Sequence, residues 1–309
     1  MSLVAKPILP NFGAEMSGVD LMAPLAAATV REILNAQDRY GVTVWRGTGL
    51  DDEGHVAFSR LFGYLEGGSK TNVGPRRLKH AELIDVGNLD IDGNIVSNEL
   101  TRAQKRGDRL WHTDGSFIAK RSAYSLLMAH EVPTEGGETW FADTRTAYDD
   151  LPRPMKDRLE GLVAQHSYWW SRKQAGFPIS EEELDAKPVA RHPLVHVHKG
   201  SGRKALYIAS HARDIEGLPR KEGRALLAEL IAHATQPRYV FKVRWNPGDL
   251  VCWDNLCSMH RGGEFDDERQ RRDMRRTTVR EGPAPDVPDD PYAEMFKTSE
   301  FAFMAAGRK

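Results

Sequence analysis

The 309-residue chain lacks several features that would place it in a simple class of protein. It has only two cysteines, Cys252 and Cys257, whose spacing fits neither a disulfide framework nor a zinc site, so we expect buried free thiols. No apolar run approaches membrane-spanning length, and residues 1–7 lack the apolar core of a signal peptide. The formal net charge is −1, so no global field attracts nucleic acid or an anionic membrane. These absences predict a soluble, cytoplasmic protein.

The residues that are present favour a globular protein rich in strands. Hydrophobic residues make up 40% of the chain, enough for a sizeable core in one large domain or two small ones. Helical spacing of apolar residues occurs in four segments: 25–40, 51–62, 144–164 (interrupted by two prolines) and 218–234. Strand patterns are more numerous, at 42–45, 81–86, 124–129, 138–142, 193–198, 205–208, 239–245, 250–253 and 274–279. Polar loops are expected at 64–79, 87–109 and 171–191. This order predicts a mainly β protein with flanking helices around a double-stranded β-helix (jelly-roll) core.

The segment from Leu110 to Phe117 carries the strongest chemical pattern. His112 and Asp114 are two residues apart, so they project from the same face if the segment is extended. A neutral imidazole beside a carboxylate suits a borderline divalent metal, and a second, distant histidine would complete the two-histidine, one-carboxylate triad of non-haem Fe(II) oxygenases. His260 can supply it, because a jelly roll gathers distant strands around one open mouth. Alone, the His-x-Asp pattern is weak and is more typical of a core histidine near a turn aspartate than of a metal site.

Several further motifs recur in the order and spacing of one known family. They are Leu3 to Pro7, Arg46-Gly47, Phe62-Gly63, Leu65 to Gly68, Trp111 to Asp114, Gly136 to Thr139, Ala147 to Pro152, His198 to Lys204, Glu216 to Pro219, Trp253 to Arg261 and Arg271 to Thr278. With these motifs the chain resembles the taurine/2,4-dichlorophenoxyacetate dioxygenase family of Fe(II)- and 2-oxoglutarate-dependent oxygenases, more closely its phenoxyacetate branch. We therefore expect one catalytic jelly-roll domain in residues 1–281, followed by a linker and tail in residues 282–309.

The resemblance implies how the reaction centre is built. It implies that Fe(II) is held by His112, Asp114 and His260. It implies that Thr139 and Arg272 bind the distal carboxylate of 2-oxoglutarate, the cosubstrate that is consumed with O2. A guanidinium is a natural bidentate partner for such a carboxylate.

The resemblance also implies an anionic small-molecule substrate that is anchored by Arg276. Arg272 and Arg276 are four residues apart, so they share a face if one strand holds both. Lys70 and Asn72 could reach the substrate carboxylate from their loop. For an aryloxyacetate, hydroxylation beside the ether oxygen would give a hemiacetal that collapses to a phenol and glyoxylate, while 2-oxoglutarate becomes succinate and CO2. An alkylsulfonate or another carboxylate is the alternative substrate, and a homo-oligomer is expected.

One departure from the family pattern bears on the substrate. Asp108 stands where we expect relatives to carry asparagine, and its carboxylate would repel an anionic substrate unless it is paired, for example with Arg109. Within the basic run that precedes residue 277, solvated side chains are expected at Arg269, Arg271 and Arg275.

Other interpretations compete with the oxygenase. His192, His196 and His198 form a rival set of metal ligands, although no carboxylate at useful spacing supports them. A zinc hydrolase could use the same triad with water in the open position. A non-catalytic jelly-roll binding protein would need neither the triad nor the two arginines. The basic run could also be a solvated or nucleic-acid-binding patch.

Overall fold

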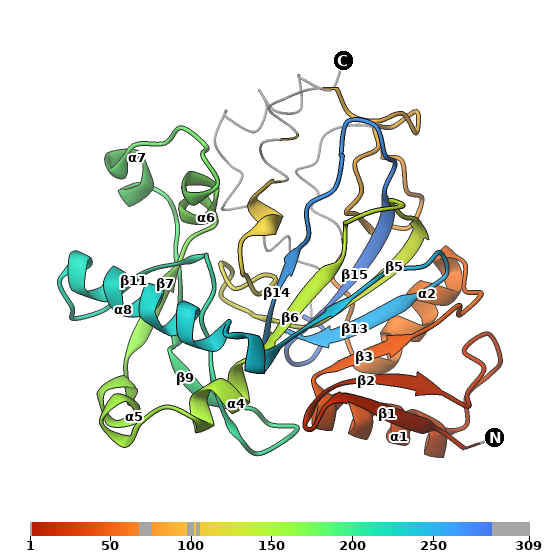
Figure 1. The fold of residues 1–309 in the computed structure, drawn as a ribbon, viewed down its shortest axis with the longest axis horizontal. Helices are drawn as coiled ribbons and strands as arrows, with labels where there is room; N and C mark the ends of the chain where they lie inside the picture. The colour runs from red at the N-terminus through yellow and green to blue at the C-terminus, as the bar shows by residue number, and fades with distance from the viewer. Residues whose placement is uncertain (1, 68–75, 98–101, 103–105, 286–309) are drawn as a thin grey trace.

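The computed structural model describes residues 2–67, 76–97, 102 and 106–285, and its largest feature is a seven-stranded sheet (Figure 1). In spatial order the strands are β1 (Val4–Leu9), β2 (Phe12–Ser17), β3 (Val42–Trp45), β13 (Leu250–Asp254), β5 (Ser122–Glu131), β15 (Asp273–Arg280) and β4 (Ile84–Asp85). All neighbours are antiparallel except the parallel pair β2 and β3. The order places strands from both ends of the chain beside one another.

A three-stranded sheet packs against one face of this large sheet. It consists of β12 (Val240–Val243), β6 (Thr139–Asp143) and β14 (Ser258–Gly262). One buried cluster joins the two sheets, with Leu127 and Val251 contributed by the large sheet and Phe141 and Phe241 by the small one. The two facing sheets confirm the predicted jelly-roll core and its mainly β class.

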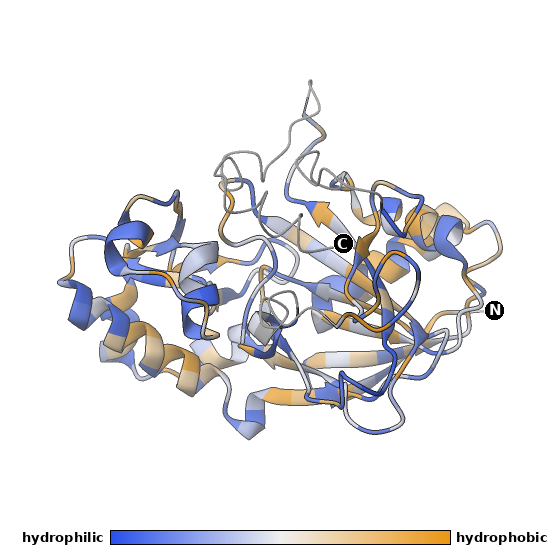
Figure 2. Cartoon of the chain, turned by 90° about the horizontal axis from the view of Figure 1, so that it is seen from above, coloured by the Kyte–Doolittle hydropathy of each residue, from blue (hydrophilic) through white to orange (hydrophobic). Residues whose placement is uncertain are grey.

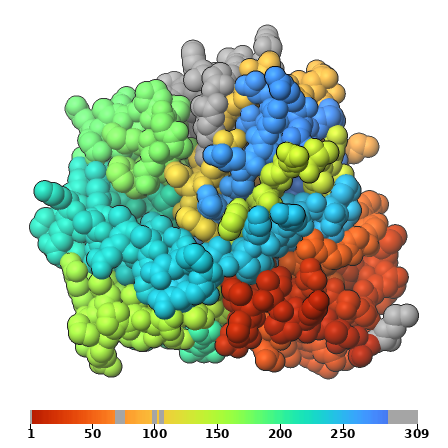
Figure 3. Space-filling view, in the orientation of Figure 1, coloured from red at the N-terminus to blue at the C-terminus, as the bar shows by residue number. Residues whose placement is uncertain are grey.

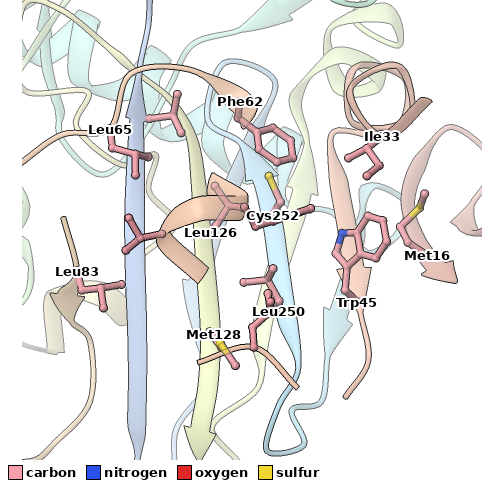
Figure 4. Packing of buried hydrophobic residues seen from close by; sticks show 14 of the residues in the cluster. Met16, Ile33, Trp45, Phe62, Leu65, Leu83, Leu126, Met128, Leu250 and Cys252 are labelled. Carbon is pink, nitrogen blue, oxygen red and sulfur yellow. The ribbon is translucent and has the colours of Figure 1, made fainter. Parts of the chain in front are cut away.

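Alternation along the central strands decides which side chains reach this inter-sheet core. On β5, Leu127 and Ala129 point into it, whereas Leu126 and Met128 point to the opposite face. That opposite face is covered by α1 (Ala27–Tyr40) and α2 (Asp52–Ser59) with the short η1 (Arg60–Phe62). Figure 4 shows its packing, with Leu126, Met128, Leu250 and Cys252 against helix and strand residues such as Ile33 and Trp45. Because both faces of β5 and β13 are covered, Leu126 to Ala129 and Leu250 to Trp253 are continuous apolar runs.

A second lobe is built from the middle of the chain. Its helices are α4 (Thr144–Asp149), α5 (Arg153–Leu159), α6 (Tyr168–Gln174), α7 (Glu181–Asp185) and α8 (Arg220–Ala234). Its strands are β7 (Val163–His166), β8 (Ala190–Pro193) and β11 (Ala212–Ile215) in one sheet, and the pair β9 (Val195–Val197) and β10 (Lys204–Leu206). Helix α8 carries a hydrophobic and a hydrophilic side in Figure 2, and its apolar side chains enter the core of this lobe. Two short 3-10 turns, η2 (Arg106–Arg109) and η3 (Pro237–Tyr239), complete the described elements. In Figure 3 the middle of the chain (green and cyan) forms one side of the molecule, beside the N-terminal segment (red).

Several local predictions were wrong. The predicted helix 144–164 ends at Leu159, because Gly161 adopts a positive φ of 76° and residues 163–166 pair as β7. The predicted strand 81–86 shortens to the two residues of β4, and β1, β2, β8, β11 and β14 were not predicted. The polar segment 171–191 contains α7, which begins with a capping box between Ser180 and Glu183. These errors concern short or polar elements, for which apolar periodicity gives little signal.

Both cysteines are free and buried, as predicted. Burial raises the pKa of each thiol well above its ordinary value, so both stay protonated and act as small apolar side chains. No helix in the described ranges is long and apolar enough to cross a bilayer.

A buried histidine outside the site gives a test of the fold's pH dependence. His55 on α2 is fully buried, with Nε2 3.1 Å from the carbonyl oxygen of Leu126, and burial lowers the pKa of its imidazole to about 4. The unfolded chain binds this proton near pH 6.5, so the stability that the neutral ring provides is present above that pH and is lost as pH falls toward 4. Between pH 7 and 5 the metal-free protein should lose about 2 kcal/mol more unfolding free energy than His55→Gln does. Urea unfolding at the two pH values measures this, and equal losses in both proteins would contradict it.

Candidate active site

The two histidines of the predicted triad are neighbours through their main chains. His112 and His260 form an isolated antiparallel bridge, in which each backbone N–H donates to the other residue's carbonyl at 2.9 and 2.8 Å. Their ring centroids are consequently 4.1 Å apart. The expected regular strand through His112 and Asp114 is absent, because residues 114–117 turn immediately after the bridge. Gly115 permits that turn with a φ of 62°, and a Cβ there would lie 2.1 Å from Ser122 Oγ.

The turn brings Asp114 against both imidazoles. Asp114 Oδ1 lies 3.8 Å from His112 Nε2, and Asp114 Oδ2 lies 3.6 Å from His260 Nε2. The three side chains are buried, and their ligand atoms all lie within 4.8 Å of one another. The structure thus gathers the three residues that the sequence predicted as metal ligands.

The donor atoms of these residues fit a divalent metal such as Fe(II). His112 Nδ1 lies 2.8 Å from the carbonyl oxygen of Leu110, so that nitrogen carries the proton and Nε2 presents its lone pair toward Asp114. Burial, followed by the influence of His112, lowers the pKa of His260 well below its ordinary value, which keeps this imidazole neutral. Burial alone would raise the pKa of Asp114, but Arg276 and the two imidazoles hold it well below the usual range. Two imidazole nitrogens and one carboxylate are therefore gathered at one place, the donor set of a two-histidine, one-carboxylate metal site.

Thr139 lies beside the triad on the small sheet. It begins β6, where Phe141 pairs with His260 and Thr139 pairs with Gly262 two positions along. Side chains two apart share a face, so Thr139 lies on the same face of β6 as Phe141, whose ring stacks on His260 at 6.2 Å. The hydroxyl is buried and accepts a hydrogen bond from Trp245 Nε1 at 3.0 Å.

Arg272 is a buried cation that immediately precedes β15. Its Nη1 donates to the carbonyl oxygen of Val86 at 3.0 Å, and its backbone N–H donates to Asn88 Oδ1 at 2.8 Å. Burial lowers the pKa of the guanidinium to about 10, opposed only by the charge of Asp108. A buried guanidinium held mainly by a carbonyl is a strong attractor for a carboxylate ligand.

Arg276 contacts the triad directly. Its Nη1 donates to Asp114 Oδ1 at 2.5 Å from within β15. Arg272 lies just outside this strand and a register shift follows at Asp273, so the two arginines do not share one regular strand face as expected. Lys70 and Asn72 lie outside the described residues.

Aromatic rings line the surroundings of the histidines. The ring centroid of Trp253 lies 4.7 Å from that of His260. On the other side, the buried ring of His211 lies 6.0 Å from that of His112 and 4.8 Å from Phe117. His211 could not be selected from the sequence, because it precedes a strand that carries no apolar pattern.

The basic and acidic residues around the site pair differently from what was expected. Asp108 pairs with Arg172 at 3.4 Å, whereas Arg109 pairs with Asp267 at 3.0 Å. Arg275 is not solvated: it is largely buried and binds Asp52 and Asp273.

The rival histidines hold the structure together instead of forming a second metal site of their own. His192 Nε2 contacts main-chain carbonyls of Ser116 and Ile118, and His196 Nε2 contacts that of Leu256. His198 does have a carboxylate partner, contrary to expectation, because its Nε2 lies 2.8 Å from Asp254 Oδ2.

His198, Asp254 and Cys257 also lie close enough to be considered as metal ligands. Hydrogen bonds already occupy these groups, since His198 Nδ1 bonds Ser201 Oγ at 2.7 Å and Asp254 Oδ1 accepts the N–H of Leu256. We interpret this cluster as a set of hydrogen bonds that stabilises the turn between β13 and β14.

Known proteins similar to this chain fall in one enzyme family. The sequence profile described as taurine catabolism dioxygenase TauD, TfdA family matches residues 5–278. A protein of Cupriavidus pinatubonensis, the alpha-ketoglutarate-dependent 2,4-dichlorophenoxyacetate dioxygenase, is 46% identical over 282 residues, which cover 90% of this chain and 98% of that protein. The (S)-phenoxypropionate/alpha-ketoglutarate-dioxygenase of Sphingobium herbicidovorans is 34% identical, over 86% of this chain and 91% of its own.

Solved structures agree with this assignment. AAD-2 in complex with Mn(II) and N-oxalylglycine is 38% identical, with a TM-score of 0.82 over 94% of this chain and 100% of that one. A putative taurine dioxygenase from Burkholderia xenovorans is 28% identical, with a TM-score of 0.74 over 94% and 95% of the two chains. Sequence and fold together place this chain in the TauD, TfdA family, as an α-ketoglutarate-dependent dioxygenase.

Proposed function

We propose that this dioxygenase hydroxylates an anionic aryloxyacetate and thereby cleaves it to a phenol and glyoxylate. The observation that carries the proposal is the contact between Arg276 and Asp114, which fixes a guanidinium at the edge of the metal triad. A guanidinium has five N–H donors in a planar fork, so it can bridge a ligand carboxylate and a substrate carboxylate. An anion bound there would place its neighbouring carbon close to the three residues that would hold the metal.

The residues of the site would divide the work as follows. His112, Asp114 and His260 would hold Fe(II), while Thr139 and Arg272 would bind the distal carboxylate of 2-oxoglutarate. Bound iron, 2-oxoglutarate and O2 supply the oxidising power, with succinate and CO2 as by-products. Arg276 aims the substrate, and buried rings such as Trp253 and Phe141 keep water away from the reacting atoms.

The substrate class draws support from the relatives and from the site. The 46% identical relative is named for 2,4-dichlorophenoxyacetate and the 34% identical one for phenoxypropionate, both of which are aryloxyalkanoates. Phe117 and His211 add aromatic faces on the His112 side of the site. A sulfate ester is the second candidate, because a 30% identical protein of Pseudomonas putida is an alpha-ketoglutarate-dependent sulfate ester dioxygenase and a guanidinium also binds that anion.

We further propose that residues 1–281 form the single catalytic domain and residues 282–309 a linker and tail. Two free buried thiols are compatible with a reducing cytoplasm, where we place the protein. Neither nucleic acid nor membrane is proposed as a partner. The homo-oligomer stays a prediction that sedimentation of the purified protein would test.

Arg276→Gln tests the substrate anchor. The change removes the positive charge but keeps some length and donor capacity, so the KM for an aryloxyacetate should rise by about tenfold or more. Slow 2-oxoglutarate decarboxylation should persist without equivalent substrate oxidation. The measurement is product formed per succinate released: phenol from 2,4-dichlorophenoxyacetate and from its amide, and sulfate from an alkyl sulfate.

Arg271→Gln is the matched control, because its guanidinium is partly exposed and pairs with Glu131. It should behave like the unmodified enzyme. If Arg276→Gln keeps both the coupling ratio and the preference for acid over amide, Arg276 is not the anchor. If the unmodified enzyme oxidises the alkyl sulfate and not the aryloxyacetate, the second candidate replaces the first.

A further inference from the structure

Both carboxylate oxygens of Asp114 accept a hydrogen bond from another side chain of the protein. Oδ1 accepts from Arg276 at 2.5 Å, and Oδ2 accepts from Ser125 Oγ at 2.7 Å. The backbone N–H of Asp114 donates in addition to Asn255 Oδ1 at 3.1 Å. The side chain and the main chain of this one residue are therefore both anchored by neighbouring side chains.

Ser125 places a polar hydroxyl group at a fully buried position. It is fully buried in the centre of β5, paired with Trp253 on β13 and with Thr278 on β15. Period-two alternation puts it on the same face as Leu127 and Ala129, which are apolar. A hydroxyl among apolar neighbours costs free energy unless it is hydrogen-bonded, and the bond to Asp114 satisfies it.

Asn255 determines the direction in which the Ser125 hydroxyl donates its hydrogen bond. Its Oδ1 accepts hydrogen bonds from the backbone N–H of Asp114 and from Trp253 Nε1, the latter at 3.1 Å. A 180° rotation of the amide would point its NH2 donors at these two N–H donors, so this orientation is fixed. Its Nδ2 consequently points at Ser125 Oγ and donates to it at 2.9 Å. Because Ser125 Oγ accepts this hydrogen bond, the single proton of its own hydroxyl is donated to Asp114 Oδ2.

We propose that Ser125 and Asn255 are positioning residues that set the orientation of the Asp114 carboxylate as a metal ligand before metal arrives. The chain Asn255 to Ser125 to Asp114 fixes rotation of the carboxylate, while the Asn255 contact to the main chain fixes the turn that carries it. The inference rests on the proposed role of Asp114 as a metal ligand. Hydrogen-bond partners of metal ligands typically change metal affinity by about 10–100-fold when they are removed.

Ser125→Ala tests this inference through metal binding to the enzyme without substrate. Titration with Mn(II), followed by the electron paramagnetic resonance signal of the free ion, should show an affinity about 10–100-fold weaker than that of the unmodified protein. Ser125→Thr restores a hydroxyl and should recover most of the affinity. The matched control is Ser59→Ala, which removes another fully buried hydroxyl, one that bonds Thr277 Oγ1 at 2.6 Å and the carbonyl of His55 at 2.8 Å.

A purely structural serine would give a different pattern. Ser125→Ala would then lower the melting temperature of the metal-free protein and leave Mn(II) affinity at the unmodified value, which overturns the inference. If Ser125→Ala does not fold, Ser125→Cys keeps the volume with a weak donor. Unmodified affinity in that variant would overturn the inference equally. Asp114→Ala in the same titration separates the two proposals, because retained Mn(II) affinity there would refute the metal site itself.

Discussion

His260→Ala is expected to abolish 2-oxoglutarate consumption while the metal-free fold survives, and His112→Ala and Asp114→Ala should do the same. Each of these residues supplies one of the three donors that the described part of the chain gathers at the site. A metal in such a site lowers the reaction barrier by several kcal/mol. Loss of the metal should therefore lower the rate by about three decades or more. The measurement is succinate released per enzyme under saturating Fe(II) and 2-oxoglutarate, together with Mn(II) affinity.

Loss of activity alone would not prove ligation, because metal binding can also stabilise folding. Circular dichroism and melting of the metal-free variants supply that check. His233→Ala is a suitable histidine control, since its Nε2 contacts the main-chain carbonyl of Ala147 at 2.8 Å in the other lobe. Near-normal 2-oxoglutarate consumption in any of the three triad variants would show that the triad is misassigned.

The sequence predicted the jelly roll and the triad for different reasons. Strands β5 and β13 contain continuous apolar runs, so Leu126 to Ala129 and Leu250 to Trp253 could be recognised as core strands. The triad came from residue chemistry and family resemblance, because nothing local in the sequence links His112 to His260. Their link is a two-residue backbone bridge, which only the folded chain creates.

Three of the missed strands share a physical cause. Strands β7, β8 and β11 have only four residues each, and their side chains mix polar or charged residues with apolar ones. A run that short does not distinguish strand from helix by periodicity. Ser125 was missed for a related reason, since one serine in an apolar strand is unremarkable until its partner Asp114 is seen 2.7 Å away.

Arg272 was predicted to bind the distal carboxylate of 2-oxoglutarate, in part because of its spacing from Arg276. The strand-face argument required Arg272 and Arg276 to lie on one strand, and the structure begins β15 only after Arg272. The burial of Arg272 supports its proposed role better than its spacing does. Burial lowers the pKa of its guanidinium to about 10, which means that the charged form is held at a cost that a bound carboxylate would offset.

Arg272→Ala is therefore expected to weaken 2-oxoglutarate binding by about one and a half to three and a half decades, with metal affinity little changed. The range corresponds to the roughly 2–5 kcal/mol lost when one partner of a buried, hydrogen-bonded charge pair is removed. Thr139→Ala should cost less, about 1.5–3 kcal/mol at most, since only one hydroxyl is lost and that hydroxyl also accepts from Trp245. The measurement is the 2-oxoglutarate concentration that half-saturates the visible band of the anaerobic Fe(II) complex.

Two further variants test whether the loss of 2-oxoglutarate affinity in Arg272→Ala comes from the lost charge at this position. Arg272→Met fills more of the vacated space than alanine, so it should lose 2-oxoglutarate affinity to a similar degree while the metal-free protein stays as stable as the unmodified one, because burying the guanidinium is itself costly. Arg269→Ala removes a highly exposed arginine three residues earlier and should leave the affinity unchanged. If Arg272→Ala and Arg272→Met both bind 2-oxoglutarate with unmodified affinity, the distal carboxylate is held elsewhere. The buried charge of Arg272 would then require another explanation.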